Sequence, residues 1–286
     1  MLEEIRALGF EYAELSHGIR ISLLPGILDA VDAGVIKIST LHNFCPLPMG
    51  IDRAAPNIFQ FSSDNPRERE NAYRYTVKTI ETAARLKAKL VVLHMGSVDM
   101  KDYTDRLLNL ISDGKKETPK YQKLLEEALR KRNDRAEEYV RESNAMLERI
   151  APVAEQHGIM LGVENREALE EIPFEDGMPL YFCEFGSATV RYWHDTGHAQ
   201  IKANIGVIDH AMHLESLAEF QAGFHIHDVE YPGHDHRAPG TGTIDFAALK
   251  PFVKPEHIKV FEMSPSLEVA EVMAGIARIK ALWGDE

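Results

Sequence analysis

Several apolar runs in this chain end on a residue that can bind a metal ion. In Trp193-His194-Asp195-Thr196-Gly197-His198, the preceding residues from Val190 are typical of a short buried strand. Asp195 stands at the carboxyl end of that strand, and His198 follows on the next turn. If such strands are parallel neighbours, their terminal side chains converge on one rim, where ligands bind in parallel α/β folds. The same arrangement recurs at four further apolar runs, which end at His94, Glu164, His225-Ile226-His227-Asp228 and Glu262.

Taken singly, each of these residues has an ordinary structural explanation. A histidine at a strand end is more often a hydrogen-bonded structural residue than a ligand, and a lone carboxylate can cap a helix or pair with an arginine. The set is different, because buried carboxylates are rare unless they are paired or bind a metal. The sequence therefore predicts a metal site formed by residues that end six of the seven predicted strands: His42, His94, Glu164, Asp195, His225 and Glu262.

The other histidines receive weaker assignments. Strand alternation places His227 on the same side as His225, where it could line the pocket. It places His194 on the side opposite to Asp195, where it would either support the metal ligands or be structural. We expect the remaining ones to lie at helix ends or on the surface without a role in the site: His17, His157, His210, His213 and His257.

Strands and helices alternate along the chain. The apolar patterns predict strands at residues 10–15, 35–42, 89–94, 159–164, 190–195, 223–228 and 257–262. They predict helices at residues 2–8, 22–33, 66–87, most of 97–157, 205–221, 245–252 and 266–282. Pro152 should bend or interrupt the longest helix. This alternation favours the α/β class and a closed (β/α), or TIM, barrel, and the absence of a linker favours a single domain over residues 1–286.

The count of strands is one short of eight. The helix at residues 2–8 has only Met1 before it. The strand that should precede this helix in a barrel is therefore missing from the sequence. An unpaired strand edge is unfavourable. We therefore expect either that the natural chain is longer at its N-terminus, or that the barrel closes with seven strands or with a neighbouring chain.

Composition excludes several classes of protein. Hydrophobic residues make up 44% and charged residues 27%, and no apolar run reaches the length of a membrane span. The first residues lack the pattern of a signal peptide, and Cys45 and Cys183 are too few for a disulfide framework, which together favour the cytoplasm. A net charge of −13 disfavours nucleic acid as a partner. The basic residues at 130–132 and 135 alternate with acidic ones and indicate a solvated helix face.

Together, these motifs resemble the xylose isomerase-like TIM-barrel superfamily over almost the whole chain. Its members include sugar phosphate isomerases and epimerases and, more distantly, endonuclease IV. The resemblance rests on Glu164-Asn165, Asp195-Thr196-Gly197-His198, His225-Ile226-His227-Asp228, the run from His234 to Gly242, and Glu262. In the epimerase branch it implies one divalent metal held by Glu164, Asp195, His225 and Glu262. It further implies that His198 and Arg237 contact the substrate.

Proteins of the endonuclease branch hold three zinc ions with nine ligands. The positions of those ligands on the strands are similar to positions in this sequence. Eight residues match that pattern: His42, His94, Glu164, Asp195, His198, His225, His236 and Glu262. The ninth position, an Asp two residues before the final His, is His234 here. We favour the sugar branch because Arg237 lies in an Arg-x-Pro-Gly-Thr-Gly setting, the chain is acidic and no basic loop for DNA is visible.

The expected activity is that of a metal-dependent isomerase or epimerase acting on a sugar or sugar phosphate. Glu164 and Glu262 would move the proton, and the metal would stabilise the enediolate. Nitrogen and carboxylate ligands favour Mn, Co or Zn. The alternatives are a zinc phosphodiesterase acting on abasic DNA and a non-catalytic sugar-binding module. No membrane partner is expected, and a homo-oligomer is compatible with the sequence. The residues predicted to bind substrate or additional metal are His42, His94, His198, His236 and Arg237.

Overall fold

A computed structural model describes residues 1–284 of the chain, which form two compact units. Unit 1 contains residues 1–97, 138–164 and 186–191, and unit 2 contains residues 98–137, 165–185 and those from 192 onward. Within the described residues, no helix combines the length and the apolar character that crossing a membrane requires. Both cysteines are free thiols.

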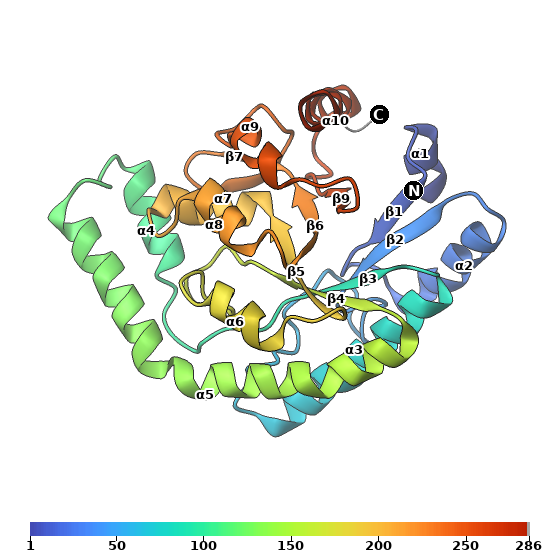
Figure 1. Ribbon diagram of the computed structural model, residues 1–286, viewed down its shortest axis with the longest axis horizontal. Helices are drawn as coiled ribbons and strands as arrows, with labels where there is room; N and C mark the ends of the chain where they lie inside the picture. The colour runs from blue at the N-terminus through green and yellow to red at the C-terminus, as the bar shows by residue number, and fades with distance from the viewer. Residues whose placement is uncertain (285–286) are drawn as a thin grey trace. The chain divides into compact units, whose positions relative to one another are not determined.

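Unit 1 contains four parallel strands that pair in chain order (Figure 1). The strands are β1 (Tyr12–Leu15), β2 (Lys37–His42), β3 (Leu90–Leu93) and β4 (Met160–Glu164). The helices are α1 (Leu2–Ala7), α2 (Leu24–Asp32), which follows the 3-10 turn η1 (Ile21–Leu23), and α3 (Pro66–Arg85). All four side chains of β3 are fully buried, as expected for a parallel strand covered on both faces.

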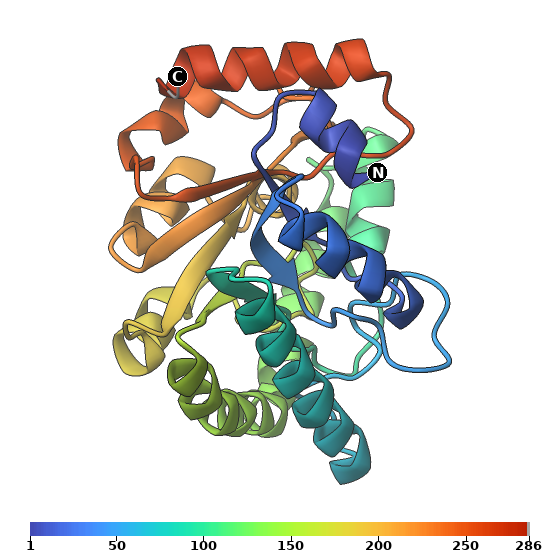
Figure 2. The same cartoon turned by 90° about the vertical axis from the view of Figure 1, so that its right-hand side faces the viewer.

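Unit 2 contains parallel strands and a two-stranded hairpin. β5 (Val190–Asp195) pairs through its residues 192–195 with β6 (Gln221–Ile226), and β6 pairs with β9 (Ile258–Phe261). β7 (Asp228–Glu230) and β8 (His234–Arg237) form the antiparallel hairpin. The helices are α4 (Thr104–Ser112), α6 (Met178–Phe185), α7 (Thr196–Ile205), α8 (His210–Leu217), α9 (Phe246–Leu249), the 3-10 turn η2 (Lys250–Phe252) and α10 (Val269–Trp283). α10 lies beside α9 (Figure 2), where the Trp283 indole N–H donates to the Phe246 carbonyl. The long helix α5 (Pro119–His157) has residues in both units.

The strand registers bring the predicted site residues to the same level within each unit. In unit 1, Leu93 lies opposite Val163, so the next residues along the two strands are His94 and Glu164. In unit 2, Asp195 lies opposite His225. All seven predicted strands are present, and residues 2–7 form a helix rather than an eighth strand.

The helices differ from the prediction in three places. Pro152 does not interrupt α5, and its position on the exposed side lets water replace the hydrogen bond lost at the carbonyl of residue 148. A bend at Pro152 stays a prediction. The helix predicted at 205–221 is two helices, because Asp195 caps the start of α7, Gly206 ends it with φ 97°, and Asp209 caps α8. α6 was not predicted at all.

The β7–β8 hairpin was also missed. Its second strand is the polar run His234–Arg237, which carries no apolar alternation, and β6 ends at Ile226 rather than at Asp228. Of the histidines expected at surfaces or helix ends, His210 begins α8, but it is buried, as are His213 and His257.

A buried ion cluster holds the segment after residue 165 against α5 and α7. The Glu175 carboxylate accepts from the Arg132 guanidinium and from the Lys202 ammonium, each at 2.7 Å, and all three side chains are at most 5% exposed. Burial alone would raise the pKa of Glu175, but Lys202 and Arg132 more than offset this and lower the pKa to about 2. Removing the Glu175 carboxylate would therefore leave the two buried cations without a counter-charge.

Replacing Glu175 by Gln should lower the free energy of unfolding by about 3 to 5 kcal/mol, because two buried cations lose their counter-charge. Denaturant unfolding at neutral pH measures this. Asp176→Asn is the matched control, since Asp176 lies 3.4 Å from Arg132 but is 67% exposed, and it should cost less than about 1 kcal/mol. In the native protein the contribution of Glu175 should persist above pH 4.5, the ordinary pKa of a glutamate, and be lost as the pH falls toward 2. Equal effects of the two substitutions would contradict this account.

Candidate metal centre

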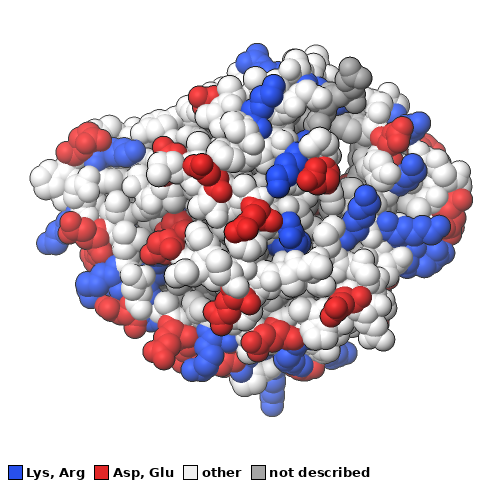
Figure 3. Space-filling model, viewed as in Figure 1, with Lys and Arg blue, Asp and Glu red and all other residues white. Residues whose placement is uncertain are grey.

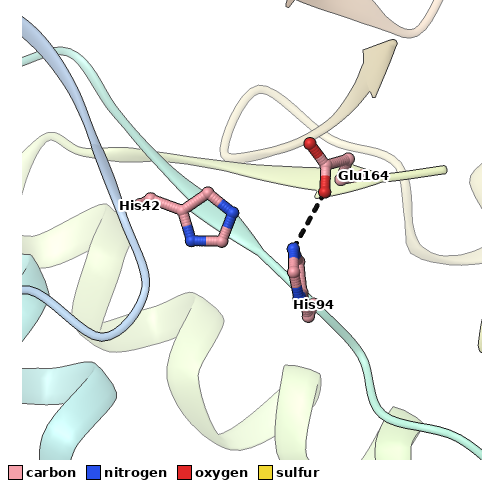
Figure 4. A group of neighbouring side chains, drawn as sticks. All are labelled: His42, His94 and Glu164. Atoms are coloured by element: carbon pink, nitrogen blue, oxygen red, sulfur yellow. Dashed lines mark ion pairs between the residues drawn. The ribbon is translucent and has the colours of Figure 1, made fainter. Parts of the chain in front are cut away.

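In unit 1, three of the predicted site residues converge: His42, His94 and Glu164 (Figure 4). Each offers a ligand atom within 4.8 Å of the others. Nε2 of His94 lies 2.9 Å from the Glu164 carboxylate, which is almost fully buried. Two imidazoles and one carboxylate at this spacing form a donor set suited to a divalent transition metal.

The rings in this group are held by neighbours of unit 1. Nδ1 of His94 lies 2.8 Å from Oδ1 of Asn57, and Nδ1 of His42 lies 2.8 Å from the Asn43 carbonyl oxygen. A carbonyl oxygen can only accept, so Nδ1 of His42 carries a proton, and Nε2 is the nitrogen that could bind a metal. His17, to which we assigned no role, packs its ring edge-on against His42 with centroids 4.8 Å apart.

In unit 2, Asp195, His225 and Glu262 form a second group with ligand atoms within 4.8 Å of one another. Nδ1 of His225 lies 3.1 Å from the Glu262 carboxylate and 3.8 Å from that of Asp195. Asp195 and His225 are fully buried, whereas Glu262 is 25% exposed. Two carboxylates on one buried imidazole form a site with excess negative charge, which a divalent cation would neutralise.

Neighbouring contacts explain the residue types of the Asp195-Thr196-Gly197-His198 run. Oδ1 of Asp195 accepts the His198 N–H at 2.8 Å and so starts α7. The Thr196 hydroxyl donates to the His227 carbonyl oxygen at 2.7 Å, and the His227 N–H donates back to that hydroxyl. A Cβ at Gly197 would overlap the ring of His227, so no larger residue fits. The motif therefore fixes Asp195 and His227 together.

His227 orients the Asp195 carboxylate directly. Its Nδ1 accepts the N–H of His236 at 2.9 Å, so Nε2 carries the proton and donates to Asp195 at 3.0 Å. Burial alone would lower the pKa of His227, but the carboxylate of Asp195 raises it above the ordinary value. The sequence placed His227 at the pocket but did not identify this bond.

A third group contains two residues that sequence reasoning missed, Glu167 and Asp235. Glu167, His198 and Asp235 offer ligand atoms within 4.8 Å of one another. Asp235, rather than His234, is the residue of the β7–β8 hairpin in this group. Burial, reinforced by the charge of Asp235, raises the pKa of Glu167 to about 7. The only sequence signal for Glu167 was its place three residues after a predicted ligand, on a segment with no regular pattern.

His236 lies between the second and third groups. Burial alone would lower its pKa, but the hydrogen-bonded carboxylate of Asp235, 3.0 Å from Nδ1, raises it to about 9. Nε2 of His236 lies 4.0 Å from Glu262, and its ring stacks on His227 with centroids 4.4 Å apart. Its φ of 54° lies in the left-handed region, which costs backbone energy for a residue other than glycine.

Arg237 and the glycines after it are organised by Asp228. Arg237 pairs across the hairpin with Glu230 at 2.6 Å. The buried Asp228 carboxylate accepts backbone N–H groups from Val229, Gly240, Gly242 and Ile244, at 2.7 to 3.1 Å. Gly240 has φ 88°, and a Cβ at Gly242 would overlap Asp228. The Pro-Gly-Thr-Gly run is thus a loop wrapped around one carboxylate.

The family of the chain follows from comparison of its sequence with family models. The model described as xylose isomerase-like TIM barrel matches residues 2–276. The chain belongs to this family. Membership confirms the predicted resemblance and the α/β barrel class, and the match includes residues of both units. The single domain over residues 1–286 and the roles of individual site residues stay predictions. No match was found among curated proteins.

Several solved structures share the fold of this chain at low sequence identity. A D-tagatose 3-epimerase-like protein aligns with a TM-score of 0.68 and 18% identity, covering 99% of this chain and 91% of that one. A 3-keto-D-glucoside 4-epimerase from E. coli aligns with a TM-score of 0.68 and 17% identity, covering 98% and 92%. A D-psicose 3-epimerase solved with D-fructose gives a TM-score of 0.66 and 13% identity, covering 99% and 92%.

Replacing Asp228 by Ala should loosen the loop at residues 239–244. Four backbone N–H groups would lose a charged acceptor worth about 1.5 to 3 kcal/mol per bond, so the amides of Gly240, Gly242 and Ile244 should exchange more than about tenfold faster. Hydrogen exchange followed by NMR or mass spectrometry measures this. Asp245→Ala, which removes the cap of α9 at Ala247 and Ala248, is the control and should leave those three amides unchanged. Unchanged exchange in Asp228→Ala would show that this carboxylate does not hold the loop.

Proposed function

We propose that this protein is a divalent-metal-dependent isomerase or epimerase of a sugar or sugar phosphate. The observation that carries the proposal is the group of Asp195, His225 and Glu262, in which two carboxylates face one buried imidazole. Family membership supports it, as do the names of the similar structures, which are sugar epimerases.

The residues fit a resident transition metal. Asp195 and His225 are buried, and Nε2–H of His227 orients Asp195. Glu164 is proposed as the fourth ligand because it ends β4, and strand ends form the ligand-binding rim in barrels of this class. Mixed nitrogen and oxygen donors favour Mn, Co or Zn over Mg or Ca, which prefer oxygen shells.

The proposed chemistry is proton transfer at a carbon beside a carbonyl group. When bound, the metal would act as a Lewis acid toward the substrate oxygens. Glu262 is the most exposed carboxylate of its group, at 25%, and is the proposed base that takes the proton. Glu164 is the proposed acid that returns it on the other side of the carbon. His42, His94, His198, His236 and Arg237 are proposed to orient substrate hydroxyls or a phosphate, or to hold additional metal.

One observation favours a second candidate, a zinc phosphodiesterase acting on abasic DNA. The residues that the structure describes contain three groups of potential ligands, and two or three metal ions can activate water against a phosphodiester. The charge distribution argues for the sugar. On the face drawn in Figure 3, Lys and Arg side chains are interspersed with Asp and Glu, whereas binding of DNA phosphates calls for a basic surface.

Replacing Glu262 by Gln should abolish exchange of substrate hydrogen with solvent. The change removes both a ligand charge and the proposed base, so the rate should fall by more than about 100-fold. The purified protein is loaded with Mn²⁺ and incubated in D₂O with D-fructose, D-psicose and D-tagatose, and NMR follows deuterium incorporation next to the carbonyl.

The matched control is Glu256→Gln, the same chemical change at an exposed residue before the opposite end of β9. It should keep the wild-type rate. Equal loss in both variants would contradict the role of Glu262. If the unsubstituted protein cleaves abasic DNA and exchanges no sugar hydrogen, the isomerase proposal fails.

A further inference from the structure

One tryptophan fills the face of β5 and β6 just before the group of Asp195, His225 and Glu262. Trp193 of β5 lies opposite Gly223 of β6, and Asp195 lies opposite His225 two residues further along. Residues two apart on a strand point to the same face, so Trp193 and Gly223 share the face of the candidate ligands. The side chain of Trp193 is fully buried there.

Gly223 has no side chain because the Trp193 ring takes the space. A Cβ at this position would overlap Cζ3 and Cη2 of Trp193, and also the carbonyl oxygen of Ile258 on β9. A glycine inside a strand costs conformational entropy and often marks the close approach of another group. The cost is accepted here two residues before the candidate ligand His225, where the indole reaches from β5 onto β6.

The Trp193 ring also contacts the imidazole of His225. The ring centroids lie 5.1 Å apart and the planes meet at 76°, an edge-to-face arrangement. The buried imidazole has its Nδ1 3.1 Å from the Glu262 carboxylate and 3.8 Å from that of Asp195. The indole occupies the space on the side of the strand starts. The imidazole therefore cannot turn toward that side and away from the two carboxylates.

Packing, rather than a hydrogen bond, holds the indole in place. Among residues 1–284, no acceptor lies within hydrogen-bonding distance of the buried Trp193 indole N–H. A buried tryptophan usually has a partner for this group, as Trp283 has in the Phe246 carbonyl. A glycine inside a strand and an indole without an acceptor thus coincide beside one candidate ligand. Departures from ordinary core packing are expected where a functional site is supported.

The same construction occurs beside Asp195. Gly197 leaves space for the ring of His227, whose Nε2 donates to Asp195 at 3.0 Å. In both places a glycine makes room for an aromatic ring that lies against a candidate ligand. The ring of His227 holds its ligand by a hydrogen bond, whereas the ring of Trp193 can do so only by packing.

We propose that Trp193 is a positioning residue that restricts the His225 imidazole to the rotamer facing Asp195 and Glu262. Ligands are held in a productive geometry by neighbours that lock their rotamers. An imidazole that already has its binding orientation loses less conformational entropy when an ion binds. The effect on metal binding rests on the proposed function, whereas the restriction of the rotamer rests on packing alone.

The positioning role is tested by Co²⁺ affinity, measured by competition with a chelator. Trp193→Leu removes the ring and leaves all three candidate ligands of the group in place. It should bind Co²⁺ about tenfold more weakly, which is the lower end of the effect of losing a residue that supports metal ligands. Trp193→Phe keeps an aromatic ring beside His225 and should recover part of the lost affinity.

Trp283→Leu is the matched control, because Trp283 is the other tryptophan of the chain and packs on the opposite face of β6. Its ring lies against that of Phe224, with centroids 5.3 Å apart. Both leucine variants leave a cavity and should lower Tm, and Trp283→Leu also loses a hydrogen bond. Only Trp193→Leu should weaken Co²⁺ binding. Unchanged affinity in Trp193→Leu, or equal weakening in both variants, would refute the positioning role.

The rotamer can also be observed without metal, in crystal structures of the metal-free protein. The unsubstituted protein should show one His225 rotamer in contact with Trp193. In Trp193→Leu, or in Trp193→Phe if the leucine variant does not fold, the imidazole should turn in part into the space that the indole leaves. A single unchanged rotamer would overturn the proposal. If the unsubstituted protein binds no Co²⁺, the proposed function fails, and these structures still decide whether Trp193 restrains His225.

Discussion

The organisation of the ligand group in unit 2 depends on satisfying the Asp195 carboxylate in a fully buried position. A buried carboxylate without partners would cost several kcal/mol. Here one oxygen caps α7 through the His198 N–H, and the carboxylate accepts from Nε2 of His227. Gly197 is required because the His227 ring occupies the space of a side chain. The Asp-Thr-Gly-His sequence thus places one carboxylate at a strand end and lets neighbouring groups donate hydrogen bonds to it.

Much of the fold could be predicted because it depends on local patterns. Seven apolar runs gave seven strands, and the residues that end them form two of the three ligand groups, His42 with His94 and Glu164, and Asp195 with His225 and Glu262. A metal-binding residue type at the end of a strand is a reliable signal of a site. The register of parallel strands brings residues at their ends beside one another. Asp195 is also a residue type that favours the N-cap of a helix. We considered it only as a ligand and therefore predicted the start of α7 too late in the chain.

The rest could not be predicted because it depends on contacts between segments distant in sequence. The hairpin His234–Arg237 has no apolar alternation, and its pairing with Asp228–Glu230 is set by the turn and by the loop that wraps Asp228. Glu167 and Asp235 lie 68 residues apart in number and have no pattern of their own, yet they meet at His198. His210 begins α8, as expected, but its burial was not predicted, because it depends on a contact with His194 from another element.

The central claim is that the residues at these strand ends hold a divalent transition metal that serves proton transfer. The most direct test is the metal content per chain of protein purified without added metal, measured by elemental analysis. The account predicts about one equivalent of Mn, Co, Fe or Zn, and its loss when Glu262 is replaced by Gln. A protein that contains no transition metal and binds none when Mn²⁺, Co²⁺ or Zn²⁺ is supplied would contradict it. Two or three equivalents of zinc would instead favour the phosphodiesterase.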